Sequence, residues 1–256
     1  MLFDTKKPSF EDFRLVYPKS KLDKNIYKIW RWFFIGKLSL YVSWIAARLN
    51  ITPNQITYLS FFVGLIGIYF FSQGSFLIGA LLINLWYLLD CSDGHLARYY
   101  KIKSKLGKFL DDGFGEIIII FMWFALGWGL FKYPDKSISF IYNYFNLVNY
   151  EYIIFCGSLA SISIALKSCI SNRFPNNYVK NNNKFISKNK PHSKKYLKIL
   201  WTNCMGFAGI QGPLLIVCSY IGCIGALLIF YSTAYFLFLI ILIIYFINKL
   251  YNLSNE

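Results

Sequence analysis

Charged side chains are scarce in this sequence, and acidic ones are fewer than basic ones. Asp, Glu, Lys and Arg make up 15% of the 256 residues, with 12 acidic residues against 27 basic ones. Apolar residues make up 56% of the chain and aromatic residues 20%. This balance excludes an ordinary soluble domain. It predicts an integral membrane protein, because several runs approach the ~20 residues that cross a bilayer.

Cysteine pairs are also lacking. The chain has two His and six Cys, and no two Cys form a CxxC pair. Most of the cysteines lie in apolar runs, where a free thiol packs as a small hydrophobic side chain. The pattern therefore argues against a thiol-based metal site and against dithiol redox chemistry.

The apolar runs predict an all-α integral membrane protein with six transmembrane helices in a core at 56–249. An aromatic segment with spaced Lys and Arg, 25–49, precedes them and is typical of an amphipathic helix lying in the membrane interface. Pro53 ends that helix, and Asn54 can cap the next one. We expect a single membrane domain over 1–250, with terminal tails at 1–24 and 251–256. The predicted spans are 56–72, 76–99, 107–131, 150–169, 205–230 and 232–249.

The positive charges alternate between the predicted connections. Counted by segment, 25 of the 27 Lys and Arg residues fall on one side of the membrane and two on the other. Cytoplasmic connections carry such an excess, so both termini are expected in the cytoplasm. The membrane explains the net charge of +15 without a nucleic-acid partner. We expect the inner or plasma membrane of a prokaryote.

A basic, Asn-rich loop is predicted at 171–198. One interpretation is a cytoplasmic loop near anionic lipid. The other is a lid that recruits a phosphorylated or acidic substrate.

The turn between the second and third predicted helices, DCSDGHLARYYKIKSKLGKFLDDGFGE (90–116), carries five of the twelve acidic residues. Charges at the membrane face are costly, so this cluster indicates a functional site. At about 100° per residue, Asp90 and Asp93 share a helix face with Gly94 and Ala97. A divalent cation between the two carboxylates would relieve their repulsion, and oxygen ligands favour Mg²⁺, Mn²⁺ or Ca²⁺.

Two further side chains complete this predicted site. Arg98 supplies a planar fork for phosphate oxygens. On the third helix, Gly107, Asp111 and Gly115 share a face, so Asp111 can close the metal cluster from the opposite side. Metal, Arg and a membrane-embedded cytoplasmic opening together indicate phosphoryl chemistry on a lipid.

The stretch resembles the signature of the CDP-alcohol phosphotransferases, D-x2-D-G-x2-A-R-x8-G-x3-D-x3-D. The wider resemblance covers roughly residues 25–250, with a TPN-like entry to the first span, and places Asn54 and Thr57 near the nucleotide. The matching residues are Asp90, Asp93, Gly94, Ala97, Arg98, Gly107 and Asp111.

The resemblance implies an enzyme that cleaves a CDP-activated donor, releases CMP and joins the remaining phosphoryl group to an acceptor alcohol. The donor is usually CDP-diacylglycerol, and other members use CDP-linked head groups. The resemblance also implies two divalent cations, Mg²⁺ or Mn²⁺, held by the signature aspartates, and a homodimer. Gly94, Ala97, Arg98 and Gly107 would surround the CDP and its phosphates.

The sequence departs from the signature at its fourth aspartate, where Gly115 stands. That aspartate is a metal ligand of the family and the proposed base for the acceptor hydroxyl. In one alternative Glu116 or Asp112 replaces it, either by a register shift or by a one-residue π-bulge that turns Glu116 into place. In a second, catalysis proceeds without a fourth carboxylate. In a third, the protein binds a CDP-linked lipid or nucleotide without turnover. A transporter is disfavoured, because the charged cluster lies at the predicted cytoplasmic edge rather than at mid-membrane.

Overall fold

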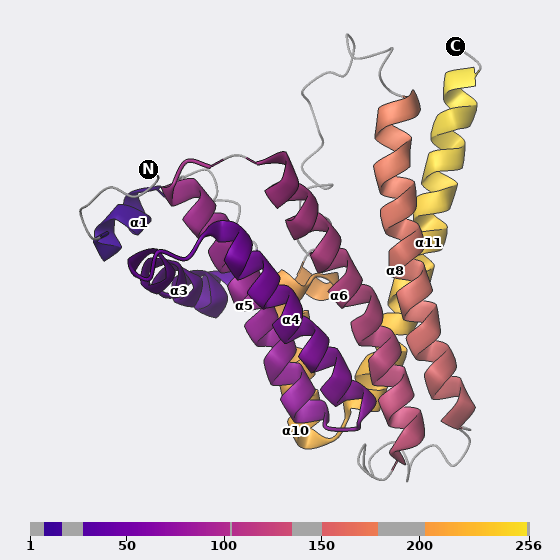
Figure 1. Ribbon diagram of the computed structural model, residues 1–256. Coiled ribbons are helices and arrows are strands. Elements are labelled where there is room, and N and C mark those ends of the chain that lie inside the picture. Colours follow the sequence, from indigo (N-terminus) through magenta and orange to yellow (C-terminus); the bar gives the residue numbers. More distant parts are fainter. Residues whose placement is uncertain (1–7, 17–27, 103, 135–149, 179–202, 255–256) are drawn as a thin grey trace.

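The computed structural model describes residues 8–16, 28–102, 104–134, 150–178 and 203–254. In these ranges all regular structure is helical (Figure 1). The elements are α1 (Phe10–Val16), the π-helical turn η1 (Arg31–Ile35), α3 (Gly36–Arg48), α4 (Pro53–Ser72), α5 (Phe76–Tyr99), α6 (Lys105–Lys132), α8 (Tyr150–Tyr178), the π-helical turn η3 (Phe207–Gln211), α10 (Gly212–Ile221) and α11 (Ile224–Ser254).

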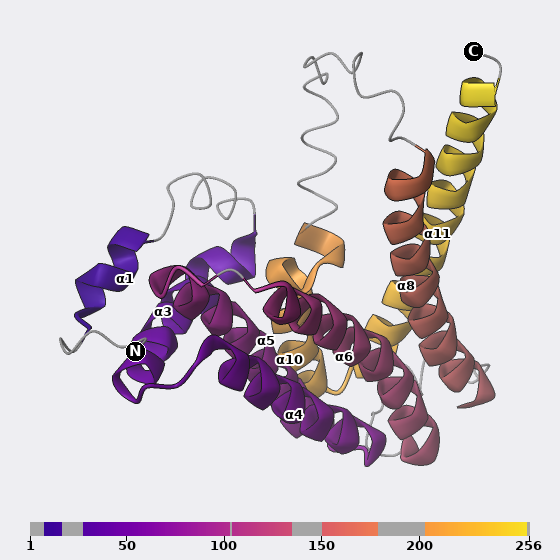
Figure 2. The same ribbon diagram turned by 45° about the horizontal axis from the view of Figure 1, so that its top comes forward.

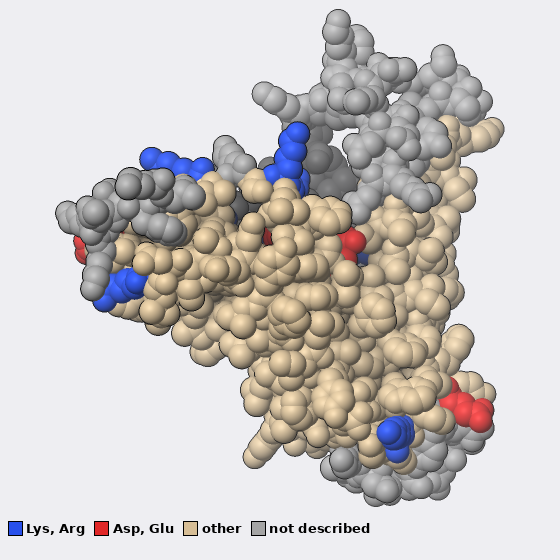
Figure 3. Space-filling view, viewed as in Figure 1, with Lys and Arg blue, Asp and Glu red and all other residues tan. Residues whose placement is uncertain are grey.

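Five of these helices are long and apolar enough to cross a membrane. They confirm an all-helical integral membrane protein and the first four predicted spans. The last span begins earlier than predicted, at Ile224 rather than at residue 232. On the face in Figure 3, charged side chains gather toward the upper and lower ends, with a broad uncharged belt between them. The spanning segments are Pro53–Ser72, Phe76–Tyr99, Lys105–Lys132, Glu151–Ser171 and Ile224–Asn248.

The predicted fifth and sixth spans, 205–230 and 232–249, have the wrong boundary. The chain breaks at Gly222, which adopts a left-handed conformation (φ 84°) and ends α10 with its N–H bonded to the Cys218 carbonyl. Glycine favours this helix-ending conformation because it has no Cβ. The last helix therefore starts at Ile224, and the apolar segment before the break, Phe207–Ile221, is shorter than a full span.

Two other predicted boundaries also change. Thr52, rather than Asn54, caps α4, with Pro53 in the first turn: the Thr52 Oγ1 accepts from the Gln55 N–H, and the Gln55 Oε1 accepts from the Thr52 N–H at 2.8 Å. This reciprocal pair satisfies two backbone donors that a helix start leaves open. The loop predicted to begin at 171 begins later, because α8 continues to Tyr178. Residues 179–198 of that loop lie outside the described residues.

The segment before α4 is helical, as predicted, from residue 29 to Arg48. The buried residues of α3 are all small, two Ser and two Ala, and Ser43 donates to the Ser92 carbonyl of α5 at 2.9 Å. The large apolar side chains of the segment, among them Phe33, Tyr41 and Ile45, are exposed. An interfacial position would bury these side chains in lipid and remains a prediction. The predicted N-terminal tail contains α1, whose Phe13 is buried and stacks on Tyr99.

The long helices pack closely. In Figures 1 and 2, α4 and α5 lie side by side, as do α8 and α11, and α6 contacts both α4 and α8. At the α6–α8 crossing two glycines meet: a Cβ on Gly127 would lie 2.9 Å from the Gly157 Cα. Small residues allow such backbone approach, which drives helix association in a membrane. This crossing fixes α8 beside the part of α6 that follows the acidic turn.

We predict that Gly127→Ala destabilises the protein by about 1–3 kcal/mol, because its methyl group collides with backbone that cannot give way. Gly225→Ala is the matched control, since a Cβ there meets no atom within 4 Å. Thermal unfolding of both variants in detergent checks this. Equal stability of the two variants would contradict the close crossing.

Candidate functional site

The acidic turn joins the end of α5 to the start of α6. Ser104 caps α6, its hydroxyl accepting from the Gly107 N–H at 3.2 Å. Asn54 of α4 packs against the same turn, since a Cβ on Gly107 would lie 3.2 Å from the Asn54 Oδ1. The first turns of α4 and α6 and the last turns of α5 therefore meet at one point.

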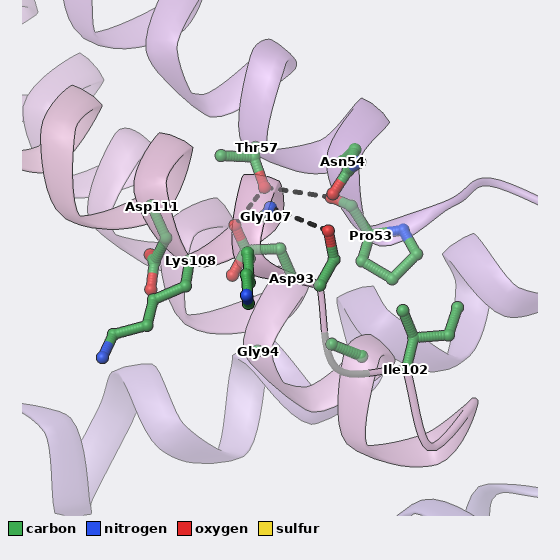
Figure 4. Close-up of a pocket in the computed structure, with 12 residues that line it drawn as sticks. Pro53, Asn54, Thr57, Asp93, Gly94, Ile102, Gly107, Lys108 and Asp111 are labelled. Carbon is green, nitrogen blue, oxygen red and sulfur yellow. Dashed lines mark hydrogen bonds between the residues drawn. The ribbon is translucent and has the colours of Figure 1, made fainter.

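A cavity of about 460 Å³ opens where these three helix ends meet (Figure 4). Five predicted site residues line it: Asp93, Gly94, Ala97, Gly107 and Asp111. The sequence analysis had also placed Asn54 and Thr57 near the nucleotide, and both line the cavity. The remaining lining residues are Pro53, Ile102, Ser104, Lys105 and Lys108. The sequence analysis did not name Ser104, although a Ser just before an apolar helix is a typical N-cap signal.

Asp93 is the most deeply buried acid of the site, with 5% of its surface exposed. Its Oδ2 accepts a 2.6 Å hydrogen bond from the Thr57 hydroxyl, which is itself buried (Figure 4). A buried carboxylate needs such a partner, because desolvation penalises its charge. The bond ties α5 to α4 and directs the carboxylate into the cavity.

Asp90 of α5 and Asp111 of α6 lie close together. Their side chains lie within hydrogen-bonding reach of each other, and both interact electrostatically with Arg31. Burial lowers the pKa of the neighbouring Lys28 because it disfavours the charged form, and repulsion from Arg31 lowers it further. The acidic group is thus partly balanced by a cation from the N-terminal segment, which the sequence analysis did not identify.

That N-terminal segment is held in place by two buried amides. Trp30 Nε1 donates to the Asn84 side chain of α5 at 3.2 Å, and the Ile29 N–H donates to the Asn203 side chain at 3.0 Å. These bonds fix η1, and with it Arg31, beside the acidic side chains.

Arg98 lies beside the cavity rather than among its lining residues. Its Nη2 is 3.0 Å from His95 Nδ1, and a Cβ on Gly94 would lie 3.4 Å from its Nη1. The glycine therefore leaves room under the guanidinium. A phosphate group in the cavity could approach both the Gly94 backbone and the guanidinium fork.

The oxygen donors have the chemistry that Mg²⁺ or Mn²⁺ prefers. Asp90 lies within hydrogen-bonding reach of Asp111, and Asp93 shares the cavity with Asp111. Across the described part of the chain, however, no three or more His, Cys, Asp or Glu side chains are gathered closely enough to hold an ion. The carboxylate oxygens are therefore of the kind that Mg²⁺ or Mn²⁺ prefers, but among the described residues they do not form a complete coordination site.

The candidate replacement bases lie on another face of α6. Asp112 and Glu116 are exposed and do not line the cavity. Glu116 accepts a hydrogen bond from Ser168 of α8 and lines a second cavity. The suggested π-bulge is wrong: α6 is a regular α-helix from Lys105 to Lys132, which leaves Glu116 about 140° from Asp111 around the helix.

Gly115 leaves free space on α6. A Cβ built there would meet no atom within 4 Å. The position lies about 40° from Asp111 around the helix. The backbone can therefore accommodate a fourth aspartate on the Asp111 face, and only the side chain is absent.

Comparison with known proteins identifies this part of the chain. Residues 50–168 match the family model described as CDP-alcohol phosphatidyltransferase. This stretch runs from the entry to α4 into α8 and includes the whole cavity. Residues 50–168 form a CDP-alcohol phosphatidyltransferase domain.

Two curated proteins are also similar to this chain. An archaetidylinositol phosphate synthase of Pyrococcus horikoshii is 35% identical over 108 residues, which are 41% of this chain and 55% of that protein. An uncharacterized protein of Aquifex aeolicus is 31% identical over 90 residues, 35% of this chain and 46% of that protein. The chain thus spans about half the length of the relatives it matches. The family match ends in α8, so η3, α10 and α11 lie outside the matched CDP-alcohol phosphatidyltransferase stretch.

We predict that Thr57→Val destabilises the domain by about 1–3 kcal/mol, because it removes the side-chain hydrogen bond from the buried Asp93 carboxylate and leaves that oxygen facing a methyl group. Thr233→Val is the control, since Thr233 is exposed and bonds only to carbonyls of its own helix. Thermal unfolding in detergent measures both variants. The bond would carry little energy if the two changes had the same effect.

Proposed function

We propose that the protein is a membrane CDP-alcohol phosphotransferase. It transfers a substituted phosphoryl group from a CDP-linked donor, CDP-diacylglycerol, to an acceptor alcohol and releases CMP, as a step of phospholipid biosynthesis. The observation that carries this proposal is the gathering of five signature residues, with Asn54 and Thr57, around one cavity at the membrane edge. The cavity and both termini are placed on the cytoplasmic side, because 25 of the 27 Lys and Arg residues fall on that side.

The donor's pyrophosphate is placed in the α4–α5–α6 cavity. Gly94, Ala97 and Gly107 leave space for it close to the backbone. Arg98 offers two parallel donors to phosphate oxygens, and Lys108, also on the cavity wall, adds positive charge. The diacylglycerol part would extend into the surrounding lipid.

Asp90, Asp93 and Asp111 would hold Mg²⁺ or Mn²⁺. A bound divalent cation supplies positive charge to the pyrophosphate oxygens. The Thr57 hydroxyl keeps the Asp93 carboxylate directed into the cavity, and Arg31 offsets part of the acidic charge from the side of the N-terminal segment. The family resemblance also leads us to expect a homodimer.

In the transfer step, the acceptor hydroxyl oxygen bonds to the phosphorus distal to cytidine. The bond from that phosphorus to the bridging oxygen breaks, and CMP leaves with that oxygen. The hydroxyl proton passes to a carboxylate, for which Glu116 and Asp112 are the candidates. A non-catalytic protein that binds a CDP-linked lipid or nucleotide is the alternative, and Gly115 is the observation that favours it.

CMP release by the purified chain with CDP-diacylglycerol, Mn²⁺ and a panel of alcohols tests the proposal. We expect Asp93→Asn to abolish release, and either Glu116→Gln or Asp112→Asn to slow it about 10²–10⁴-fold, the usual loss for a missing general base. Loss in Asp93→Asn alone would mean that no fourth carboxylate is used. CDP binding without release for any alcohol would favour the non-catalytic alternative.

A rescue experiment tests the geometry at Gly115. Gly115→Asp is added to whichever of Glu116→Gln and Asp112→Asn is slow. We expect it to raise the rate of CMP release at least about tenfold, because it returns a carboxylate to the Asp111 face of α6. Gly113→Asp is the matched control. A Cβ also meets nothing at Gly113, but that position lies about 200° from Asp111 around the helix. Equal rescue by both changes would show that position on the helix is irrelevant.

A further inference from the structure

A second cavity, of about 330 Å³, lies between α6, α8, η3 and α11. Its volume falls within the range of small-molecule sites. The lining residues are Glu116, Ile119, Ile164, Lys167, Ser168, Ser171, Met205, Gly206, Phe207, Gln211 and Tyr235.

Opposite charges meet in this cavity. Glu116 accepts a hydrogen bond from the Ser168 hydroxyl and interacts electrostatically with Lys167 on the same turn of α8. The Lys167 ammonium also lies 5.5 Å from the centre of the Phe238 ring. Among the described lining residues, Glu116 is the acid and Lys167 the base, so their charges offset each other.

The rest of the polar lining is uncharged. Gln211 is 2% exposed and donates to the Tyr235 hydroxyl at 2.8 Å, which in turn donates to the Met205 carbonyl at 3.0 Å. This chain of bonds holds the η3 backbone against α11. With the Ser168 and Ser171 hydroxyls, the cavity presents amide, hydroxyl and carboxylate groups beside apolar walls, a lining that suits a ligand with several hydroxyl groups.

The two cavities lie on different faces of α6. Asp111 faces the first cavity and Glu116 the second, about 140° apart around the helix. Gly115 lies between these faces, and the space beside its Cα is open. The missing side chain at this position leaves a gap where groups bound on the two sides could meet.

We infer that the second cavity holds the acceptor alcohol, and that Glu116 restricts it to an uncharged polyhydroxy alcohol without phosphate. This inference rests on the proposed function. The Glu116 carboxylate accepts hydrogen bonds from hydroxyl groups and repels a phosphate dianion. The charge of Lys167 is already offset by Glu116, so it does not attract a phosphate unopposed.

Binding to the purified full chain in lipid nanodiscs, with CMP present, tests the inference by calorimetry. The probes are myo-inositol and glycerol against their monophosphates. We expect wild type to bind each polyol at least about tenfold more tightly than its phosphate, a difference equivalent to ~1.4 kcal/mol. Glu116→Gln is expected to abolish this preference, and the charge-preserving Glu116→Asp to keep it.

Glu151→Gln is the control, because Glu151 is exposed at the opposite end of α8. Thermal unfolding identifies any variant that fails to fold. If Glu116→Gln fails to fold, Lys167→Gln replaces it. Lys167→Gln is expected to weaken phosphate binding further, because it removes the positive charge of the cavity. A wild-type preference for the phosphates, or a preference that Glu116→Gln leaves unchanged, would overturn the inference. CMP release is measured in parallel. Preference for the polyols without CMP release would refute the proposed function and leave the polyol preference of the second cavity standing. CMP release without that preference would support the proposed function and refute the inference about the second cavity.

Discussion

The gathering of three carboxylates at the edge of an apolar helix bundle is the constraint on which the rest of this structure depends. Asp93 is almost wholly buried and is stabilised by the Thr57 hydroxyl. Asp90 and Asp111 approach each other from two helices, with Arg31 acting on both. Buried like charges destabilise a fold unless partners offset them. The Thr57 hydroxyl and Arg31 are the partners that offset part of this cost.

Small residues make this arrangement possible. Gly107 lets α4 approach the start of α6, and Gly127 and Gly157 let α6 and α8 touch. These contacts place α6 between two cavities, one facing α4 and α5 and the other facing α8 and α11. A regular α6 then separates Asp111 from Glu116. Donor and acceptor would approach this helix from different sides and meet near Gly115.

The N-terminal segment belongs to the site as much as the spanning helices do. Its position depends on Asn84 and Asn203, two amides far apart in the sequence. Asn84 also donates to the Gly212 carbonyl and so links η1 and α10 through one side chain. The C-terminal elements beyond the family match therefore help to position Arg31 beside the acidic group.

The sequence by itself determined the membrane character, most of the spanning helices and the identity of the signature residues, because hydropathy and motif spacing are local properties. It placed the fifth and sixth helices wrongly, since a single left-handed Gly222 outweighs the continuous apolar pattern around it. It also assigned the α4 cap to Asn54, which the fold uses at the cavity wall instead. Only the tertiary structure decided that Arg31 lies beside Asp90, that Glu116 faces α8 and that Gly115 borders open space. These facts depend on how helices distant in sequence pack and rotate against one another, which no local pattern encodes.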